Sequence, residues 1–270
     1  MTALKSSIGR EYTNASLPKL AAITCDIESD FGGRTGGFEL LENAAPVEEL
    51  LEWCKRMNAP LTGFVVTSLF ERKFPGVQTL IKNGIELHPH SHSHDVKTYR
   101  DTSLQEIAKA QDVWTKHFGT PAEGYRAPQG VLSPGDLLAL QENGYSFDSS
   151  IFPAKRMGVF DNRDLPRNPW DWHNGLLELP FAATSDRKRL TLSTVKLWGK
   201  KYWEKRLDDL SPSIVLDTHL HDFATPRGLR SLPLYLQIAY SRNKDEGYAL
   251  LSWLTEELQE RGYRFVTMTE

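Results

Sequence analysis

The chain has 270 residues, of which 40% are hydrophobic and 25% are charged. This size and composition predict a globular protein with a substantial core and exclude a disordered chain. The 32 lysines and arginines against 35 aspartates and glutamates give a formal net charge of -3, and no basic block is present, so neither nucleic acid nor an anionic membrane is an expected partner.

The first half of the chain alternates apolar runs with segments of helical periodicity. Apolar runs bounded by turn residues predict strands at 20–27, 61–70 and 85–90. Apolar residues at helical spacing predict helices at 46–57, 76–84 and 103–119. We expect Ser103 to cap the last of these helices in a capping box with Glu106.

The second half continues this alternation. Predicted strands lie at 123–128, 145–152, 176–181 and 213–223, and predicted helices at 133–144 and 245–262. Neither a repeat nor a linker divides the chain, so we predict a single domain over residues 1–270, with its core from about residue 20 onward. Strands and helices that alternate over this length predict an α/β fold with a parallel sheet, either open or closed into a barrel.

The expected location follows from two further features. Residues 1–19 contain no secretory apolar run, and no stretch approaches the ~20 apolar residues of a membrane span. Cys25 and Cys54 are too few for a disulfide framework and fit a reducing compartment. These features predict a cytoplasmic protein.

Polar residues gather at four predicted strand ends, which is where parallel α/β folds place their chemistry. They are Asp26, Glu28 and Asp30; His88, His90, His92 and His94; Arg126; and Asp217, His219 and His221. Each group alone has a common structural explanation, such as a helix cap or a solvated loop charge. Together they offer two imidazoles and a carboxylate for an open metal site, a second carboxylate as base, an arginine to keep it ionised and a histidine as acid. That combination predicts a hydrolase.

Five motifs between about residues 20 and 223 resemble, in order, those of the polysaccharide deacetylases of carbohydrate esterase family four. The motifs are 24–28 (TCDIE), 84–94 (GIELHPHSHSH), 126–130 (RAPQG), 147–153 (FDSSIFP) and 220–222 (LHD). The fourth is similar to the exopolysaccharide-type branch of the family. The resemblance implies a distorted (β/α) barrel with about seven strands.

The resemblance also implies residue roles. The implied metal ligands are Glu28, His90 and His94, and the implied catalytic residues are Asp26 as general base, Arg126 as the cation that keeps this base ionised, and His221 as general acid on the leaving amine. The implied cofactor is a divalent metal, with Zn²⁺ expected ahead of Fe²⁺, Co²⁺ or Mn²⁺.

The spacing of the histidines does not by itself choose the ligands. His90 and His94 are four residues apart, which would place both rings on one side of a helical turn, but His88 and His92 share that spacing. The resemblance selects His90 and His94. We expect His88 to lie in the strand and His92 to face solvent or the edge of the cleft.

Two positions depart from the family pattern or leave a choice open. The commonest first motif has adjacent aspartates, and Ile27 stands where the second would be. Glu28 is the expected replacement because residues two apart on a strand point to the same side, and Asp30 is the alternative. At the late motif, His219 is an alternative to His221 as the acid.

The leading prediction is a metal-dependent hydrolase that removes N-acetyl groups, or less readily O-acetyl groups, from a sugar, glycan or glycan precursor. The alternatives are hydrolysis of another non-peptide C–N bond on the same fold, and a non-catalytic carbohydrate-binding protein. Trp170 and Trp172 loosely match a family motif and are equally explained as packing residues. The sequence does not indicate the oligomeric state or the role of residues 155–205.

Overall fold

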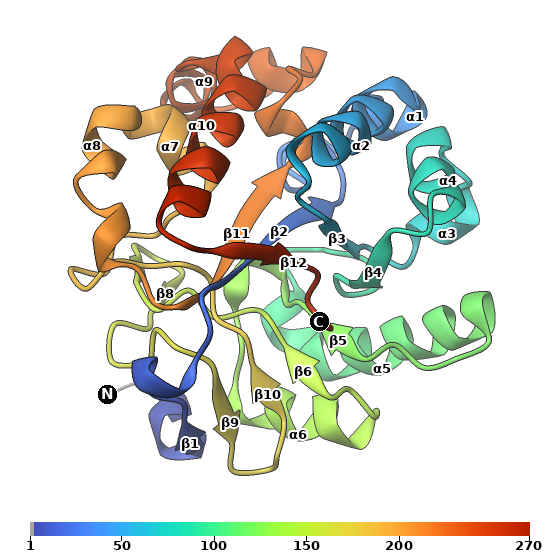
Figure 1. The fold of residues 1–270 in the computed structure, drawn as a ribbon. Coiled ribbons are helices and arrows are strands. Elements are labelled where there is room, and N and C mark those ends of the chain that lie inside the picture. Colours follow the sequence, from blue (N-terminus) through green and yellow to red (C-terminus); the bar gives the residue numbers. More distant parts are fainter. Residues whose placement is uncertain (1–2) are drawn as a thin grey trace.

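The structure is a computed structural model, and it describes residues 3–270. Strands and helices alternate along most of the chain, as Figure 1 shows. The strands are β1 (Ile8–Glu11), β2 (Leu20–Ile27), β3 (Leu61–Val65), β4 (Glu86–Pro89), β5 (Gly124–Tyr125), β6 (Phe147–Asp148), β7 (Lys155–Arg156), β8 (Phe160–Asp161), β9 (Trp170–Trp172), β10 (Leu177–Glu178), β11 (Ser213–His219) and β12 (Arg264–Val266).

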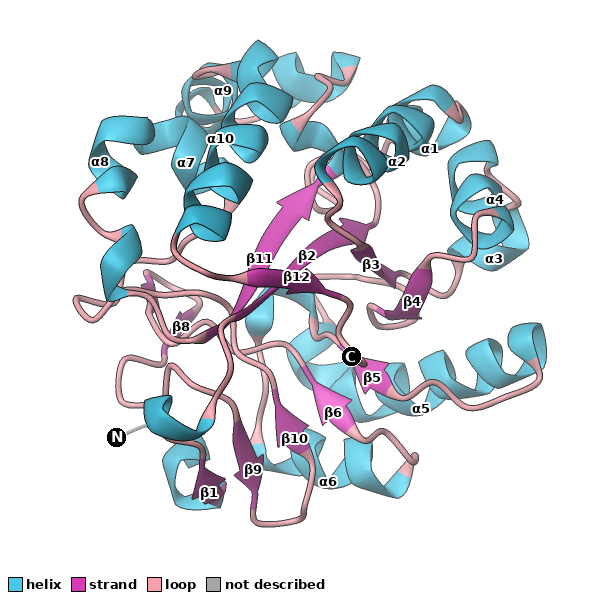
Figure 2. Cartoon of the chain, in the orientation of Figure 1, coloured by secondary structure: helices cyan, strands magenta, loops and turns pink. Residues whose placement is uncertain are grey.

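Helices lie outside most of the strands, whereas β1 and β9 lie at the lower edge of the molecule in the view of Figure 2. The α-helices are α1 (Glu39–Glu42), α2 (Ala45–Met57), α3 (Leu69–Arg72), α4 (Pro75–Lys82), α5 (Tyr99–Phe118), α6 (Pro134–Glu142), α7 (Leu192–Trp198), α8 (Lys200–Glu204), α9 (Leu234–Ser241) and α10 (Gly247–Glu260). Helix α2 packs against α4, α5 against α6 and α7 against α10. Among the described residues, no helix combines the length and the apolar character needed to cross a membrane.

The parallel sheet is centred on β2. One path of paired strands runs β11-β2-β3-β4, and β12 pairs with the first residues of β2, at Leu20–Ala22, before the pairing with β3 begins at Ile23. A second path runs β5-β6-β10 in parallel and continues through the antiparallel strands β9 and β1. Each path alone would be an open sheet.

The two paths join at both edges and form a distorted barrel. Beside β4 and β5, the Arg126 N–H donates to the Pro89 carbonyl at 3.0 Å. Beyond β10, Phe181 forms a parallel bridge with Val215 of β11, and the Ala182 N–H donates to the Val215 carbonyl at 2.9 Å. The strands β2, β3, β4, β5, β6, β10 and β11 therefore follow one another around a curled (β/α) barrel, which confirms the predicted fold class.

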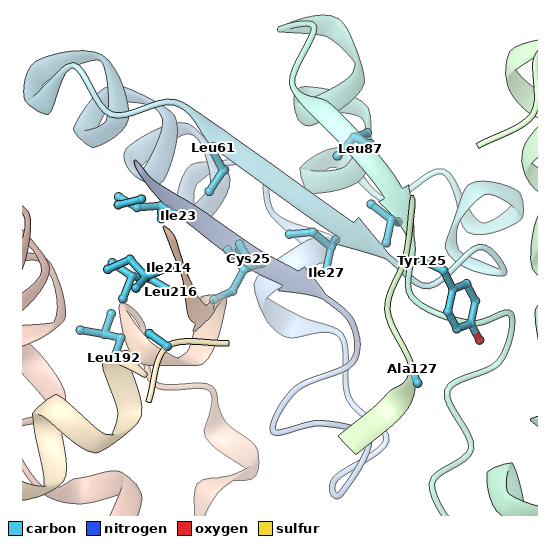
Figure 3. Close-up of a cluster of buried hydrophobic side chains, with 14 of the residues drawn as sticks. Ile23, Cys25, Ile27, Leu61, Leu87, Tyr125, Ala127, Leu192, Ile214 and Leu216 are labelled. Carbon is cyan, nitrogen blue, oxygen red and sulfur yellow. The ribbon is translucent and has the colours of Figure 1, made fainter. Parts of the chain in front are cut away.

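Alternation along β2 separates the outer core from the barrel interior. Its odd-numbered residues Ile23, Cys25 and Ile27 are fully buried and pack in the cluster shown in Figure 3, between the sheet and the surrounding helices. Its even-numbered residues point to the other side, where Ala22 packs in a second cluster with Phe64, Phe181 and Val215. Asp26 is even-numbered and therefore points into the barrel, whereas Cys25 is a packed core residue.

Every predicted helix and strand is present, but several strands are shorter than predicted. The strands at 123–128, 145–152 and 176–181 are reduced to Gly124–Tyr125, Phe147–Asp148 and Leu177–Glu178, and two others end where the backbone changes conformation. The strand predicted at 61–70 ends at Val65, because Leu69–Arg72 forms the short helix α3 and buries Leu69 and Phe70. The strand predicted at 213–223 ends at His219 and is followed by a 3-10 turn over Leu220–Asp222. In both cases the apolar run continues across a change of backbone conformation, which periodicity over so few residues does not reveal.

Candidate metal and catalytic site

Polar side chains from four strand ends meet in one cavity of about 210 Å³, which we call the central cavity. It lies at the carboxyl ends of β2, β4, β5 and β11. Its lining includes Asp26, Glu28, His90, His94, Arg126, Asp217, His219 and His221. The structure thus brings together every residue that the sequence assigned to metal binding or catalysis.

The side chains of Glu28, His90 and His94 place ligand atoms within 4.8 Å of one another. His94 Nε2 lies 2.8 Å from Glu28 Oε2, and His90 Nε2 lies 3.9 Å from the same oxygen. His90 Nδ1–H donates to the Arg126 carbonyl at 2.9 Å, and its Nε2 lone pair is therefore free to face the cavity. Two imidazoles and a carboxylate that converge in this way fit a divalent metal ion with open coordination positions.

The protonation states of two of these side chains also fit ligand roles. Burial on its own would raise the pKa of Glu28, but the adjacent histidines, His94 first, outweigh burial and hold that pKa well below its usual range. Burial lowers the pKa of His90 to about 4, against an opposing effect of Asp26. An ionised carboxylate and a neutral imidazole are the forms that bind metal.

The segment that carries the histidine ligands is a tight loop. Ser91 and His94 have φ values of 60° and 56°, a left-handed conformation that no continuous α-helix contains. The His94 N–H donates to Ser91 Oγ at 3.1 Å, which closes the turn. The helical turn expected from the spacing is therefore wrong, although the loop still brings the His90 and His94 rings to a centroid distance of 4.7 Å.

Glu106, on helix α5, holds this loop in place. Its carboxylate accepts hydrogen bonds from the N–H groups of His92 (2.9 Å) and Ser93 (2.7 Å) and from the Ser93 hydroxyl (2.7 Å). The capping box predicted for Ser103 and Glu106 is wrong, because α5 begins at Tyr99 and Ser103 lies inside it. The three-residue spacing of Ser103 and Glu106 predicted a local helix cap, whereas the Glu106 side chain instead binds the loop that precedes the helix.

Asp26 and Arg126 form a buried ion pair beside the three ligand side chains. Arg126 donates from one guanidinium nitrogen to Asp26 Oδ1 at 2.7 Å and to Thr24 Oγ1 at 2.9 Å, and from Nε to the Ser149 carbonyl at 2.9 Å. Asp26 Oδ2 faces the other way, 3.5 Å from His90 Nε2. Burial opposes ionisation, but His90 and Arg126 lower the pKa of Asp26 below its usual value. Asp26 is therefore an ionised carboxylate with one oxygen tied and the other available.

The end of β11 adds a carboxylate and two imidazoles. His219 Nε2 lies 3.5 Å from Glu28 Oε1 and 3.8 Å from Asp26 Oδ2, and its Nδ1 lies 3.7 Å from Asp222 Oδ2. His221 also lines the cavity, with its ring 4.7 Å from that of His219. Burial raises the pKa of Asp217 to about 7. Of the two histidines, His219 makes the closer approach to the acidic residues.

The remaining histidines of the run lie away from the site. His88 is in β4, where its Nδ1 accepts from the Gly124 N–H at 3.2 Å and its ring packs against Phe64 and Phe147. His92 is partly exposed, and its Nδ1 lies 3.1 Å from Thr67 Oγ1.

Asp30, Trp170 and Trp172 have structural roles outside the group of metal ligands. Asp30 accepts hydrogen bonds from the N–H groups of Glu39 (2.9 Å) and Leu40 (3.4 Å) at the start of α1. Its oxygens therefore hold that helix rather than join the Glu28 group. Trp170 and Trp172 lie buried in β9, which makes them packing residues.

Sequence reasoning missed part of the cavity wall. Arg34, Arg156, Arg189 and Tyr240 also line it. They come from loops, from the short strand β7 and from helix α9, which lie far apart in the chain. No periodicity or short motif links them, so no sequence signal marks them as neighbours.

Comparisons with known proteins agree with the resemblance seen in the motifs. Residues 19–147 match the family model described as polysaccharide deacetylase. No curated protein matches the chain in sequence.

Solved structures share the fold at low sequence identity. A candidate polysaccharide deacetylase from Mycobacterium smegmatis superposes with a TM-score of 0.55 at 18% identity, covering 97% of this chain and 98% of that chain. A peptidoglycan N-acetylglucosamine deacetylase gives a TM-score of 0.52 at 16% identity, covering 93% and 86%. A candidate polysaccharide deacetylase involved in O-antigen biosynthesis, from Bordetella bronchiseptica, gives 0.50 at 16% identity, covering 91% and 93%.

Proposed function

Because the chain carries a polysaccharide deacetylase domain, matched over residues 19–147, we propose that it is a metal-dependent hydrolase that removes acetyl groups, N-acetyl groups foremost, from a sugar, glycan or glycan precursor. One observation carries the proposal. The Glu28, His90 and His94 group and the Asp26–Arg126 ion pair line the same cavity, with Asp26 Oδ2 only 3.5 Å from His90 Nε2. A binding protein has no need of a carboxylate base beside a ligand set.

In this proposal Glu28, His90 and His94 hold a divalent ion. Two imidazole nitrogens and one carboxylate oxygen suit zinc, and they leave positions open for water and substrate. When bound, such an ion polarises the acetyl carbonyl and makes water more acidic. The hydrogen bond from His90 Nδ1–H to the Arg126 carbonyl orients the His90 ring for that role.

Asp26 acts as the general base. Its Oδ1 is tied to Arg126 at 2.7 Å, and its Oδ2 is available to take a proton from the attacking water as the water oxygen bonds to the acetyl carbon. Arg126 is held between the rings of Phe64 and Phe181, 3.7 and 4.4 Å from their centroids. Its fixed guanidinium keeps Asp26 ionised and oriented.

A histidine from the end of β11 acts as the general acid. As the C–N bond breaks, the leaving nitrogen needs a proton, and the products are acetate and the free amine. The sequence resemblance assigns this role to His221. The geometry favours His219, because its Nε2 lies within 4 Å of both Glu28 and Asp26 while Asp222 lies behind its Nδ1. A carboxylate near an imidazole favours the protonated form that a general acid needs.

The substrate class follows from the family. The neighbours in fold include one whose name specifies peptidoglycan N-acetylglucosamine and one tied to O-antigen biosynthesis. The first name specifies an acetylated amino sugar of a glycan, and the second specifies a polysaccharide deacetylase. We extend that class to this chain, with isolated sugars and glycan precursors included.

The test is acetate release by zinc-loaded protein from N-acetylated sugars, oligomers, nucleotide sugars and lipid-linked sugars. We expect release from at least one of them, loss of release after treatment with a chelator, and recovery when zinc is restored. The His219→Ala and His221→Ala variants are measured in the same assay to assign the acid. If the zinc-loaded protein releases no acetate from any substrate, the proposed reaction is wrong.

A further inference from the structure

Three arginines line the central cavity together with the candidate metal and catalytic residues. Arg34 comes from the loop after β2, Arg156 from β7, and Arg189 from the segment before α7. Separate segments of the chain thus deliver a guanidinium each to one cavity. The packing of a single helix or strand therefore does not account for the presence of all three guanidinium groups in this cavity.

None of these arginines is paired with a carboxylate among the described residues. The ion pairs found over residues 3–270 do not include Arg34, Arg156 or Arg189, in contrast with Arg126, which is bound to Asp26. Arg34 and Arg189 contact neutral groups, which do not cancel the positive charge of a guanidinium. Arg34 donates to the Phe31 carbonyl at 2.8 Å, and the Arg189 guanidinium lies over the Phe152 ring at 5.5 Å.

The positive charges are also close enough to disfavour one another. Burial, followed by the charge of Arg34, lowers the pKa of Arg156, and burial, followed by the charge of Arg156, lowers the pKa of Arg189. Arg156 and Arg189 are partly buried and Arg34 is exposed, and burying cations without partners beside a third positive charge costs free energy. A site that tolerates this cost in the free protein is typical of one that receives an anion.

The acidic residues of the cavity do not fill that need. Asp26 is tied to Arg126, and Glu28 lies 2.8 Å from His94 Nε2. Asp217 also lines the cavity and partly offsets the lowering of the Arg156 and Arg189 pKa values, but it forms no ion pair with either of them among the described residues, and burial raises its own pKa to about 7. The three arginines therefore form a wall of unmatched positive charge within the same cavity as the catalytic groups.

We propose that Arg34, Arg156 and Arg189 form an anion subsite that binds a phosphate ester carried by the acetylated sugar. The proposal rests on the proposed function, since it names the substrate class of the same cavity. A phosphate presents several oxygens and up to two negative charges, which suits several guanidiniums better than the two oxygens and single charge of a carboxylate. The phosphate can belong to a sugar phosphate, a nucleoside diphosphate sugar or a lipid-linked sugar, and the experiment separates these sources.

The first experiment compares N-acetylglucosamine with its 1-phosphate, its uridine diphosphate ester and its polyprenyl diphosphate ester. We expect kcat/KM to be higher for at least one phosphorylated form than for the neutral sugar. Arg156→Gln and Arg189→Gln should each lower kcat/KM for that form by about 10- to 100-fold, mainly through KM, and should lower kcat/KM for the neutral sugar by a much smaller factor. Arg163→Gln is the matched control, because Arg163 is exposed and paired with Asp161 outside the cavity.

The second experiment needs no turnover and separates this inference from the proposed reaction. Binding of inorganic phosphate to the zinc-loaded protein is measured by calorimetry, with zinc content checked in every variant. Binding that is weakened in Arg156→Gln and Arg189→Gln but retained in Arg163→Gln supports the anion subsite, even if no acetate is released. The inference is overturned if the wild type does not bind phosphate, if all variants bind it equally, or if neutral and phosphorylated sugars are deacetylated equally well by every variant.

Discussion

Replacement of Glu106 should weaken metal binding, although Glu106 is not itself a ligand. Its carboxylate makes three hydrogen bonds of 2.7 to 2.9 Å to the loop between His90 and His94. Bonds to a charged acceptor contribute about 1.5–3 kcal/mol each when buried, and less where water can replace the acceptor. The bonds to Ser93 are exposed and the bond to His92 is partly buried, so we expect well below the sum of three.

The expected loss for Glu106→Ala is therefore about 10- to 100-fold in zinc affinity, or about 1.4–2.8 kcal/mol, the range typical of residues that orient metal ligands. Glu106→Gln keeps an acceptor but loses the charge, and should lie between the wild type and Glu106→Ala. The assay is competition for zinc against a chromophoric chelator. Asp112→Asn is the matched control, because Asp112 is an exposed acid on the same helix.

At saturating zinc, Glu106→Ala should recover most of its turnover, since no group that contacts the substrate is changed. The reasoning is refuted if Glu106→Ala binds zinc as tightly as the wild type does. It is also refuted if Asp112→Asn loses as much affinity, because the effect would then be one of helix charge.

Three further predictions concern single residues of the site and core. Glu28→Ala should reduce zinc affinity, measured by chelator competition, more than Asp30→Ala does. Asp30→Ala should instead lower the stability of the fold by about 1–2 kcal/mol, because it loses the hydrogen bonds to α1. If Asp30→Ala reduces zinc affinity more than Glu28→Ala does, the third ligand is reassigned to Asp30. Arg126→Lys keeps the charge but not the hydrogen bonds to Thr24 and Ser149. It should therefore lower turnover, and it should lower the free energy of unfolding measured in urea by about 3 kcal/mol. A urea midpoint equal to that of the wild type would contradict this prediction. Burial, with the charge of Asp148, raises the pKa of Glu178, and burial raises the pKa of Asp148 to about 6, so the stability from this pair is present at low pH and is lost as pH rises from about 4 through 6. Across that pH range the Tm of Glu178→Gln should therefore rise relative to the Tm of the wild type. A Tm difference that does not change with pH would argue against this prediction.

The barrel and the positions of its strands were open to prediction from the sequence where the signal is local and strong. The run at 20–27 is apolar and bounded by turn residues, and it is the observed strand β2. Its even positions carry Asp26 and end near Glu28, so period-two alternation alone places both on one side. The motifs then add the histidine and arginine positions.

The geometry of the ligand loop was beyond such reasoning. Its shape depends on left-handed backbone at Ser91 and His94, which are not glycines, and on a carboxylate 12 residues or more further along, at Glu106. A left-handed non-glycine residue is held by its surroundings rather than by its own preference. Sequence spacing therefore suggested a helical turn in its place.

The proximity of Arg34, Arg156 and Arg189 could not be predicted from the sequence for a related reason. Residues 155–205 are the stretch that resembles the family least, yet they supply Arg156 from a short hairpin and Arg189 from a segment that pairs back on Ala183. Contacts of this kind depend on how loops close over the barrel, which neither period nor propensity encodes.

The most direct test of the account measures zinc content and acetate release on the same preparations of wild type and Asp26→Asn. Asp26 is outside the Glu28, His90 and His94 group, and asparagine keeps an oxygen acceptor for Arg126. We predict one zinc per chain in both proteins, acetate release by the wild type, and a loss of about 10²- to 10⁴-fold in the variant, as expected for removal of a general base. Equal turnover by the two proteins at equal zinc content would contradict the role of Asp26 and, with it, the proposed mechanism.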